Sequence, residues 1–588
     1  MSRQRFKSYR LIIPLEFDSV FKWEFRVRPR KVLAMLSREN LVKLAMLLCK
    51  EYCGKPAIKT VQMLSSTDKH TLLLANRIKH HVVELKQQNN TDVIVAFVNT
   101  PLELLRIAFS IDPDKMRDAK VSRIDDLQWK LVKLITQINQ NLMHFKAPRK
   151  DKGDFAKLLL VNDASNRDIL KQDIKGQFVS QPIQAVLFFQ LLESKQKYTK
   201  LLNAFYERYG ISSWKEYVRS VYGLALFSLK EGTGVYPRKK IEETPELVSL
   251  SVLDKISIDA NNEVIKYACD NVCDNQGNSD YKVFKSRPLI KLSSGDFVIH
   301  NPAIVIDRLY SSLYFDFKDI REDIAGKQPD VNNLFTSEFI EKTLFSEVVS
   351  KCINHRYCKS YREEDLIQIH KITDGELGYP DCFVRQNTDE AVVLFECKDI
   401  RLNAWIKERR DYGLLEKELK NKIVTKTYKI DKKSKKQIKI SPKRIGIGQL
   451  AGHVANIRNG SFPWALDLPD DIVIYPILVI ADNRLVFDGL PRLAQKWYYE
   501  CLASEGLQKL QLERQLIMMS PLTFIKYQKL FYSKGLVYYF EKYYKSINKK
   551  PSSVVDLFNN MVSFDTFMDQ FSYSLEGLGK ELLKILYE

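Results

Sequence analysis

Residues 378–399 read GYPDCFVRQNTDEAVVLFECKD, and this stretch decides the fold that the sequence predicts. An apolar run ends abruptly in Glu396, Cys397 and Lys398, and a second carboxylate, Asp381, follows a proline upstream. Charged groups are costly to remove from water unless something pairs them. The pattern therefore predicts that a bound ion or ligand pairs with these charges at the end of a buried strand.

The spacing of these residues suggests which ion and substrate bind there. Two adjacent strands can hold Asp381 and Glu396 side by side, and one or two carboxylates with waters and substrate phosphate are the usual ligands of Mg²⁺. The peptide carbonyl of Cys397 can add a further oxygen. Lys398 lies two residues after Glu396 and so shares its face of the strand. A metal, an activated water and a lysine are the means of phosphodiester hydrolysis.

The surrounding pattern predicts the order α-β-β-β-α-β. Helical spacing and continuous apolar runs indicate the following elements: a helix over 337–353, strands over 365–372, 380–385 and 391–399, a helix over 445–460 and a strand over 471–482.

In this setting the sequence resembles the PD-(D/E)XK nuclease superfamily, which has the restriction-endonuclease-like fold. The match is Pro380-Asp381 followed by Glu396-Cys397-Lys398, and it covers roughly residues 331–490. The tripeptide alone is not specific, because Glu-Leu-Lys also occurs at 84–86. The specificity comes from the apolar strand, the Pro-Asp before it and the order of elements. The alternative interpretation is that Glu396 and Lys398 are ordinary charged residues at a strand end that point into solvent.

The resemblance implies further site residues. Many members carry a glutamine on the helix after the third strand, and Gln449 matches it in place and type. Some branches have a tyrosine four residues later, where this chain has His453, which we interpret as a packing histidine. Many members also place a glutamate on the first core helix. Glu341 and Glu347 are the candidates for this position, and an α-helical wheel favours Glu347 as a metal ligand, because it falls on the apolar face.

The charge of the chain points to a polyanionic partner. The net charge is +20, and residues 401–444 hold 16 Lys and Arg against 5 Asp and Glu, which is over half of the excess. We interpret this segment as a loop beside the catalytic strand that is either solvated or in contact with a nucleic-acid backbone. The candidate contacts are Lys432, Lys433, Lys435, Lys436, Lys443 and Arg444.

Composition predicts a multi-domain α/β protein, because 588 residues exceed what one core usually holds. We expect a mostly helical region over 1–245, a mixed region over 246–330, the nuclease-like domain over 331–490 and a helical region over 491–588. Nine cysteines without a secretory leader, and no apolar run long enough to span a bilayer, predict a cytoplasmic protein.

The expected function is metal-dependent hydrolysis of nucleic acid by an endonuclease that uses Mg²⁺, with Mn²⁺ as the alternative. DNA is favoured over RNA, and the resemblance suggests a prokaryotic restriction, phage-defence or mobile-element system. A homo-oligomer or a partner subunit of such a system stays open, and no membrane partner is expected. The alternative is a non-catalytic nucleic-acid-binding protein that keeps the nuclease fold.

Overall fold

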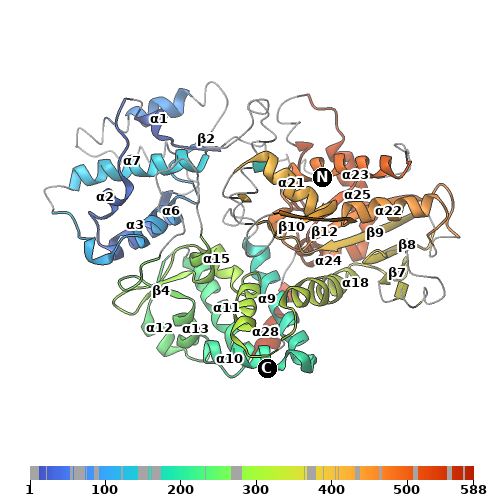
Figure 1. Cartoon of the computed structure of the whole chain (residues 1–588), viewed down its shortest axis with the longest axis horizontal. Helices are drawn as coiled ribbons and strands as arrows, with labels where there is room; N and C mark the ends of the chain where they lie inside the picture. The colour runs from blue at the N-terminus through green and yellow to red at the C-terminus, as the bar shows by residue number, and fades with distance from the viewer. Residues whose placement is uncertain are drawn as a thin grey trace.

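The computed structural model describes most of the chain. The described residues are 12–21, 23–52, 57, 73, 76–84, 92–97, 99–120, 124–143, 157, 160–161, 164, 174–231, 234–265, 281–326, 328–362, 365–366, 368, 379–388, 390–403, 406–407, 410–430, 437–462, 467–507, 514–552, 556, 559–573 and 576–587. The chain is a multi-domain α/β protein, mostly helical, with two mixed sheets (Figure 1).

The second half of the chain contains a five-stranded mixed sheet. Its strands lie in the order β13 (Ile517–Met519), β12 (Val473–Ile480), β9 (Ala391–Lys398), β8 (Cys382–Gln386) and β7 (Cys358–Arg362). Strands β9, β12 and β13 run parallel, whereas β8 and β7 are antiparallel to their neighbours. The carboxyl ends of β9 and β12 therefore meet at one edge of the sheet.

Both faces of the central strand β9 are buried, which explains its continuous apolar sequence. Val393, Phe395 and Cys397 face a core that includes side chains of η6 (Leu334–Phe345) and α24 (Pro521–Lys534). Val392 and Leu394 face the opposite core, which includes side chains of α22 (Ile447–Arg458) and α23 (Leu490–Ser504). Alternation along the strand thus places Glu396 and Lys398 on the α22 side.

The observed order of elements matches the expected α-β-β-β-α-β pattern only in part, because a helix over 412–423 and two strands over 425–430 and 437–444 come between β9 and α22. Two further differences concern the strands of the sheet. The first strand is β7, at Cys358–Arg362, and not the apolar run over 365–372. Asp365, Leu366 and Gln368 of that run are helical, and its other residues lie outside the described part of the chain. A fifth strand, β13, comes from the region expected to be helical. The remaining C-terminal elements include α25 (Leu536–Ile547) and α28 (Glu576–Tyr587).

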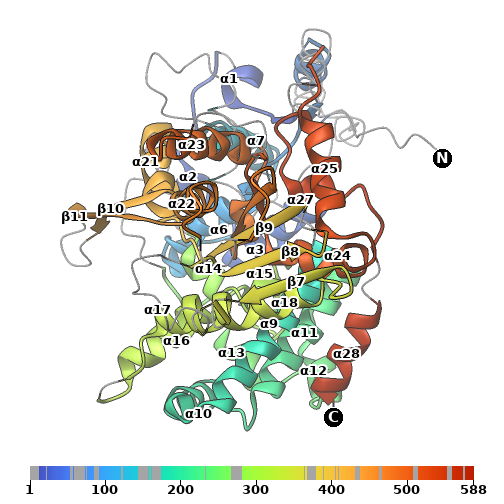
Figure 2. The ribbon, with the colours of Figure 1, turned by 90° about the vertical axis from the view of Figure 1, so that its right-hand side faces the viewer.

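The basic segment contains a helix and, over its last part, a β-hairpin, where the sequence suggested a loop. Strand β10 (Thr425–Ile430) pairs antiparallel with β11 (Gln437–Arg444), and the hairpin projects from the body of the molecule beside α21 (Tyr412–Ile423) and α22 (Figure 2). The hydroxyl of Tyr428 donates to Glu418 Oε2 at 2.8 Å, and Asn421 Nδ2 donates to the Tyr428 carbonyl at 3.1 Å. These bonds fasten the hairpin to α21.

The N-terminal half is helical around a four-stranded mixed sheet in the order β3-β6-β5-β4. Its main helices are α3 (Arg38–Leu47), α6 (Thr100–Phe109), α7 (Ile124–Met143), α9 (Ile174–Ser194), α10 (Thr199–Tyr209) and α11 (Trp214–Glu231). Its strands are β3 (Gly234–Tyr236), β4 (Ser257–Asp259), β5 (Leu289–Lys291) and β6 (Phe297–Ile299). Helix α15 (Pro302–Asp307) follows β6, and Asn301 Oδ1 caps it by accepting from Ala303 N at 2.9 Å.

One apolar cluster joins all four expected regions. It includes Phe188 of α9, Val305 of α15, Phe395 of β9 and Phe564 near the C-terminus. Helix α28 returns to pack beside α9 and α11 of the N-terminal half (Figure 1). The region boundaries stay predictions. Among the described residues, no helix is both long and apolar enough to cross a bilayer.

His300, directly after β6, makes stability depend on pH. The side chain is 2 % exposed, neither ring nitrogen has a hydrogen-bond partner in the part of the chain that the structure describes, and burial lowers the pKa of this imidazole to about 3. Below the unfolded pKa of about 6.5, the unfolded state binds a proton that the folded state does not, so stability falls as the pH falls. We expect a loss of about 2 kcal/mol between pH 7 and pH 5 from this residue. Urea unfolding of wild type and His300→Phe at both pH values measures it, and an equal loss in the two proteins would contradict it.

Candidate catalytic centre

The end of strand β9 brings two functional side chains to one face. Glu396 is 0 % exposed, and Lys398 keeps 19 % of its side chain exposed. Lys398 Nζ lies 2.8 Å from Glu396 Oε2. This distance is that of a close ion pair, and Glu396 Oε2 is buried.

Asp381 reaches the same ammonium from the start of the neighbouring strand β8. Its Oδ2 accepts from the backbone N–H of Cys397 at 2.6 Å and from Lys398 Nζ at 3.3 Å. Because both carboxylates contact one nitrogen, their oxygens Asp381 Oδ2 and Glu396 Oε2 lie at most about 6 Å apart. The structure thus brings together Asp381, Glu396 and Lys398.

Glu341 is the third carboxylate of this cluster. Its Oε1 lies 4.0 Å from Lys398 Nζ. Glu347, which the α-helical wheel favours, instead pairs with Lys351 at 2.9 Å and keeps 44 % of its side chain exposed. Helix η6 has wide i→i+5 turns over Leu334–Phe345, so an α-helical wheel assigns its faces wrongly. The structure therefore places Glu341, and not Glu347, beside the lysine.

His453 of α22 closes the buried side of the site. Its Nε2 lies 3.0 Å from Glu396 Oε1, and its ring is 4 % exposed. The interpretation of His453 as a packing histidine agrees with this burial, although the sequence did not identify Glu396 as its partner. Its position on the inward face of the helix, four residues after Gln449, was the available signal. His453 thus holds the Glu396 oxygen that does not face Lys398.

The side chains of Gln449 and Cys397 have structural roles away from the carboxylates. Gln449 Oε1 accepts from the backbone N–H of Gly446 at 2.8 Å, which caps the start of α22. The Cys397 thiol is buried in the opposite core, so only the Cys397 backbone reaches the carboxylates. The catalytic role of Gln449 and the metal contact of the Cys397 carbonyl stay predictions.

The carboxylates differ in their tendency to hold a proton. Burial, and then the charge of Glu396, raise the pKa of Asp381 well above its usual range, while Lys398 opposes this. Burial also acts to raise the pKa of Glu396, but Lys398 and His453 together hold it below its usual value. Burial would lower the pKa of Lys398, but the charges of Glu396, Asp381 and Glu341 raise it. The cluster has more negative than positive groups and so favours an added cation.

The side chains of this site can bind a hard divalent cation only if ligands from outside the protein complete its coordination. Among the described residues, no group of three or more His, Cys, Asp or Glu side chains is arranged to hold a metal ion. Asp381 and Glu396 would hold it, and waters and a substrate phosphate would complete its coordination, which is how Mg²⁺ is commonly bound. The observation that fits such an ion is the convergence of Asp381 and Glu396, two buried carboxylates from neighbouring strands, with Glu341 nearby.

The predicted nucleic-acid contacts fall on the hairpin. Lys443 is exposed on β11 opposite Lys426, and Arg444 Nη2 pairs with Glu505 at 2.5 Å. Lys432, Lys433, Lys435 and Lys436 lie outside the described residues. The first turns of α22 connect the base of the hairpin to the site, because Gly446 precedes His453 by seven residues, about 10 Å along the helix.

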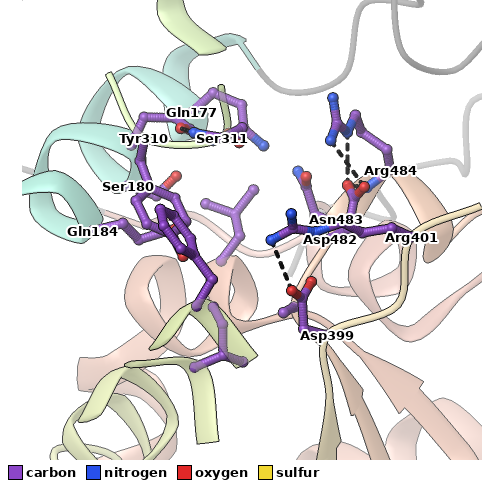
Figure 3. A pocket seen from close by; sticks show the side chains of 15 residues that line it. Gln177, Ser180, Gln184, Tyr310, Ser311, Asp399, Arg401, Asp482, Asn483 and Arg484 are labelled. Carbon is purple, nitrogen blue, oxygen red and sulfur yellow. Dashed lines mark hydrogen bonds and ion pairs between the residues drawn. The ribbon is translucent and has the colours of Figure 1, made fainter. Parts of the chain in front are cut away.

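A small pocket beyond the sheet edge adjoins this centre and was not foreseen from the sequence. On one side lie two Arg–Asp pairs: Arg401 Nη2 donates to Asp399 at 2.9 Å, and Arg484 Nε donates to Asp482 at 2.7 Å. Figure 3 shows the facing residues Gln177, Ser180, Gln184, Tyr310 and Ser311 on the other side. The paired charges balance, so this pocket adds polarity but no net charge.

Comparison with models of protein families found no match to this chain. A search of curated proteins and a search of solved structures also found no match.

Proposed function

We propose that this chain is a metal-dependent nuclease that hydrolyses phosphodiester bonds of nucleic acid, with DNA as the favoured substrate, and that it has the restriction-endonuclease-like core. One observation carries the proposal: Asp381 and Glu396, from adjacent strands, converge on Lys398 at the carboxyl edge of a sheet. The elements around them support it, because the order α-β-β-β-α-β is present once α21 and the hairpin, which come between β9 and α22, are set aside.

The residues divide the chemistry among them. Asp381 and Glu396 would hold Mg²⁺, which supplies Lewis-acid stabilisation of the charge that develops on the phosphate. Lys398, with 19 % of its side chain exposed, is the group that can orient a water and offset that charge. His453 contacts Glu396 Oε1, so Oε2 stays directed toward Lys398, whereas the Cys397 N–H and Lys398 both contact the same oxygen of Asp381, Oδ2.

The alternative is a binding protein in which Lys398 only neutralises the two acids. One buried lysine between carboxylates is a familiar structural ion pair, and removal of one partner of such a pair destabilises a protein strongly. The balance of charge argues against this alternative, because three carboxylates lie within 4.0 Å of one lysine.

Cleavage assays separate the two proposals. Purified protein is incubated with supercoiled plasmid, single-stranded DNA and RNA, each with Mg²⁺, with Mn²⁺ and with EDTA. The nuclease proposal expects cleavage that needs the divalent ion. If the protein binds all three substrates but cleaves none of them with either metal, the result would support the non-catalytic binding protein. Cleavage that persists in EDTA would contradict the metal-dependent mechanism.

The hairpin supplies a second test, of substrate contact. Lys426, Lys429, Lys439 and Lys443 are exposed along its two strands. We expect their replacement by Gln to weaken binding to unrelated duplexes alike, and each lost phosphate contact to reduce the log–log salt slope by about 0.9. Fluorescence anisotropy at several salt concentrations measures the slope.

The matched control replaces four exposed lysines of the N-terminal half and of the segment before α10. They are Lys115, Lys195, Lys197 and Lys239. The control removes the same total charge at a distance from the hairpin. Equal slopes in the hairpin variant and wild type, or an equal change in both variants, would show that the hairpin is only a solvated surface.

A further inference from the structure

The segment between α1 (Phe17–Val20) and α2 (Pro29–Leu33) leaves two aromatic rings in solvent. Trp23 is 91 % exposed and Phe25 is 95 % exposed, and among the described residues the next most exposed large hydrophobic side chain, Tyr357, is 61 % exposed. Single exposed apolar side chains are ordinary on a protein surface. Two such rings, with Cα atoms at most about 7 Å apart, form a patch of the kind that marks an interaction site.

The backbone on both sides of the rings is fastened to the N-terminal half. The N–H of Glu24 donates to the Phe21 carbonyl at 2.9 Å, and the Glu24 carboxylate pairs with Lys133 of α7 at 2.6 Å. The N–H of Val27 donates to Gln137 of α7 at 3.2 Å. Because both rings lie between these anchors in sequence, they are held at the surface in the absence of a partner.

Positive charge flanks the two rings. Residues 21–31 contain five Lys and Arg and one Glu, which gives a net charge of +4. Arg28 and Lys31 are exposed, and neither forms an ion pair with another described residue. The nearby carboxylates are already paired, Glu24 with Lys133 and Asp18 with Arg26. The segment therefore attracts a polyanion.

We propose that Trp23 and Phe25 form a stacking platform for the bases of single-stranded nucleic acid, with the phosphates beside Arg28 and Lys31. Proteins that bind single strands combine aromatic rings, on which successive bases stack, with cations along the backbone. A duplex keeps its base faces stacked inside, so the platform selects unpaired strands. The proposal rests on the proposed function for the class of partner alone, because binding here needs neither the metal nor cleavage.

A membrane surface is the other partner that aromatic rings beside cations can suit. Helices that bind membrane surfaces bury a continuous apolar face in the lipid. Residues 23–28 form no helix, and within the described residues of 12–37 the exposed large hydrophobic side chains are Trp23 and Phe25 alone. Two isolated rings in a basic, extended segment therefore fit a single strand better than a membrane.

The platform and the cleavage centre can be altered separately. Figure 1 shows α1 and α2 in the N-terminal lobe, apart from the sheet that contains β9. Substitution of an exposed ring in this lobe leaves the carboxylates around Lys398 in place. A change in single-strand binding after such a substitution is therefore not a consequence of damage to the proposed metal site.

Fluorescence anisotropy in EDTA, with a labelled oligothymidine and with a duplex of equal length, tests the proposal on the full chain. We expect the double variant Trp23→Ala, Phe25→Ala to bind the single strand at least about 10-fold more weakly, with little change for the duplex. The matched control, Phe315→Ala, Tyr357→Ala, removes two exposed rings elsewhere and should bind as wild type does. No single-strand binding by wild type, or equal binding by wild type and the double variant, would overturn the proposal.

Two comparisons distinguish stacking from other apolar contact. The double variant Trp23→Leu, Phe25→Leu keeps apolar side chains but loses the flat rings, so it should fail as the alanine variant does. Trp23→Phe keeps a ring and should retain most of the binding. An abasic oligonucleotide keeps the phosphates but lacks the bases, so wild type should bind it at least about 10-fold more weakly than oligothymidine. Full binding by the leucine variant, or equal affinity of wild type for both strands, would overturn the stacking role.

Cleavage assays in Mg²⁺ on the same preparations separate this proposal from the nuclease function. Single-strand binding that depends on the rings, without any cleavage, would support the platform and contradict the nuclease. Cleavage with single-strand binding that ignores the rings would contradict the platform alone. Sedimentation with phosphatidylcholine–phosphatidylserine vesicles gives the last outcome: ring-dependent vesicle binding with unchanged oligonucleotide binding would assign the patch to a membrane and overturn the proposal.

Discussion

Asp381→Asn and Glu396→Gln should each reduce metal-dependent cleavage of nucleic acid by about 10³-fold or more. Each substitution removes a carboxylate from the pair that converges on Lys398. A bound metal contributes several kcal/mol to stabilisation of the transition state, and every 1.36 kcal/mol is a factor of ten in rate. The measurement is the initial rate of plasmid nicking in Mg²⁺ with enzyme in excess.

The amide substitutions are preferable to alanine at these positions. Glu396 is fully buried between Lys398 and His453, so Glu396→Ala would leave a cavity and a buried charge without its partner. Gln and Asn keep the size of the side chain, and circular dichroism and thermal unfolding confirm that the fold remains. Glu347→Gln is the matched control, because Glu347 is exposed and paired with Lys351. Wild-type rates for Asp381→Asn or Glu396→Gln would refute the metal site.

Lys398→Ala should reduce the cleavage rate by about 100-fold or more, while binding of nucleic acid changes little. The substitution removes one preorganised cation from the reacting phosphate but leaves both carboxylates in place. Equilibrium binding changes little because one lysine contributes only a single phosphate contact to a surface with many cations. Single-turnover rates and anisotropy, measured on the same oligonucleotide, separate the two effects.

Lys398→Arg tests whether geometry or charge matters at this position. Arginine keeps the positive charge but replaces a compact ammonium with a wide planar group. The ammonium lies within 4.0 Å of three carboxylates, so the larger guanidinium cannot take the same place. We expect arginine to fail nearly as badly as alanine. Full activity of Lys398→Arg would show that the side chain only balances charge.

The central site was predictable from the sequence because its signal is local. Asp381 precedes a strand, Glu396 and Lys398 end the next one, and strands that are adjacent in sequence commonly pair. Register then follows from the alternation of side chains, which puts Glu396 and Lys398 on one face. The structure brings these three residues together, whereas their catalytic roles stay predictions.

Other parts of the site depend on information that single stretches of sequence do not carry. The sequence favours Glu347 over Glu341 as the metal ligand because a helical wheel assumes α-helical turns. Helix η6 has wider turns, so the wheel selects the wrong glutamate. His453 looks like any histidine on an apolar helix face until the packing of α22 brings it to Glu396. The basic segment reads as a loop, but Tyr428 and Asn421 fasten it to α21 as a hairpin. In each case tertiary contacts override the local pattern.

The pocket beside Lys398 lies furthest from what the sequence could predict. It combines Ser180 with Asp399. These partners are far apart in the sequence and meet only because their helices and strands share a core. No periodicity in the chain marks them beforehand.

The most direct measurement is anomalous diffraction from crystals of the protein grown with Mn²⁺ and an oligonucleotide whose scissile phosphates are replaced by slowly cleaved phosphorothioates. If Asp381 and Glu396 form the metal site, a manganese peak lies between them, with oxygens of both carboxylates about 2.1 to 2.2 Å away and Lys398 facing the same phosphate. A site without manganese in crystals that hold bound oligonucleotide and excess Mn²⁺, or manganese bound only elsewhere, would refute the metal site.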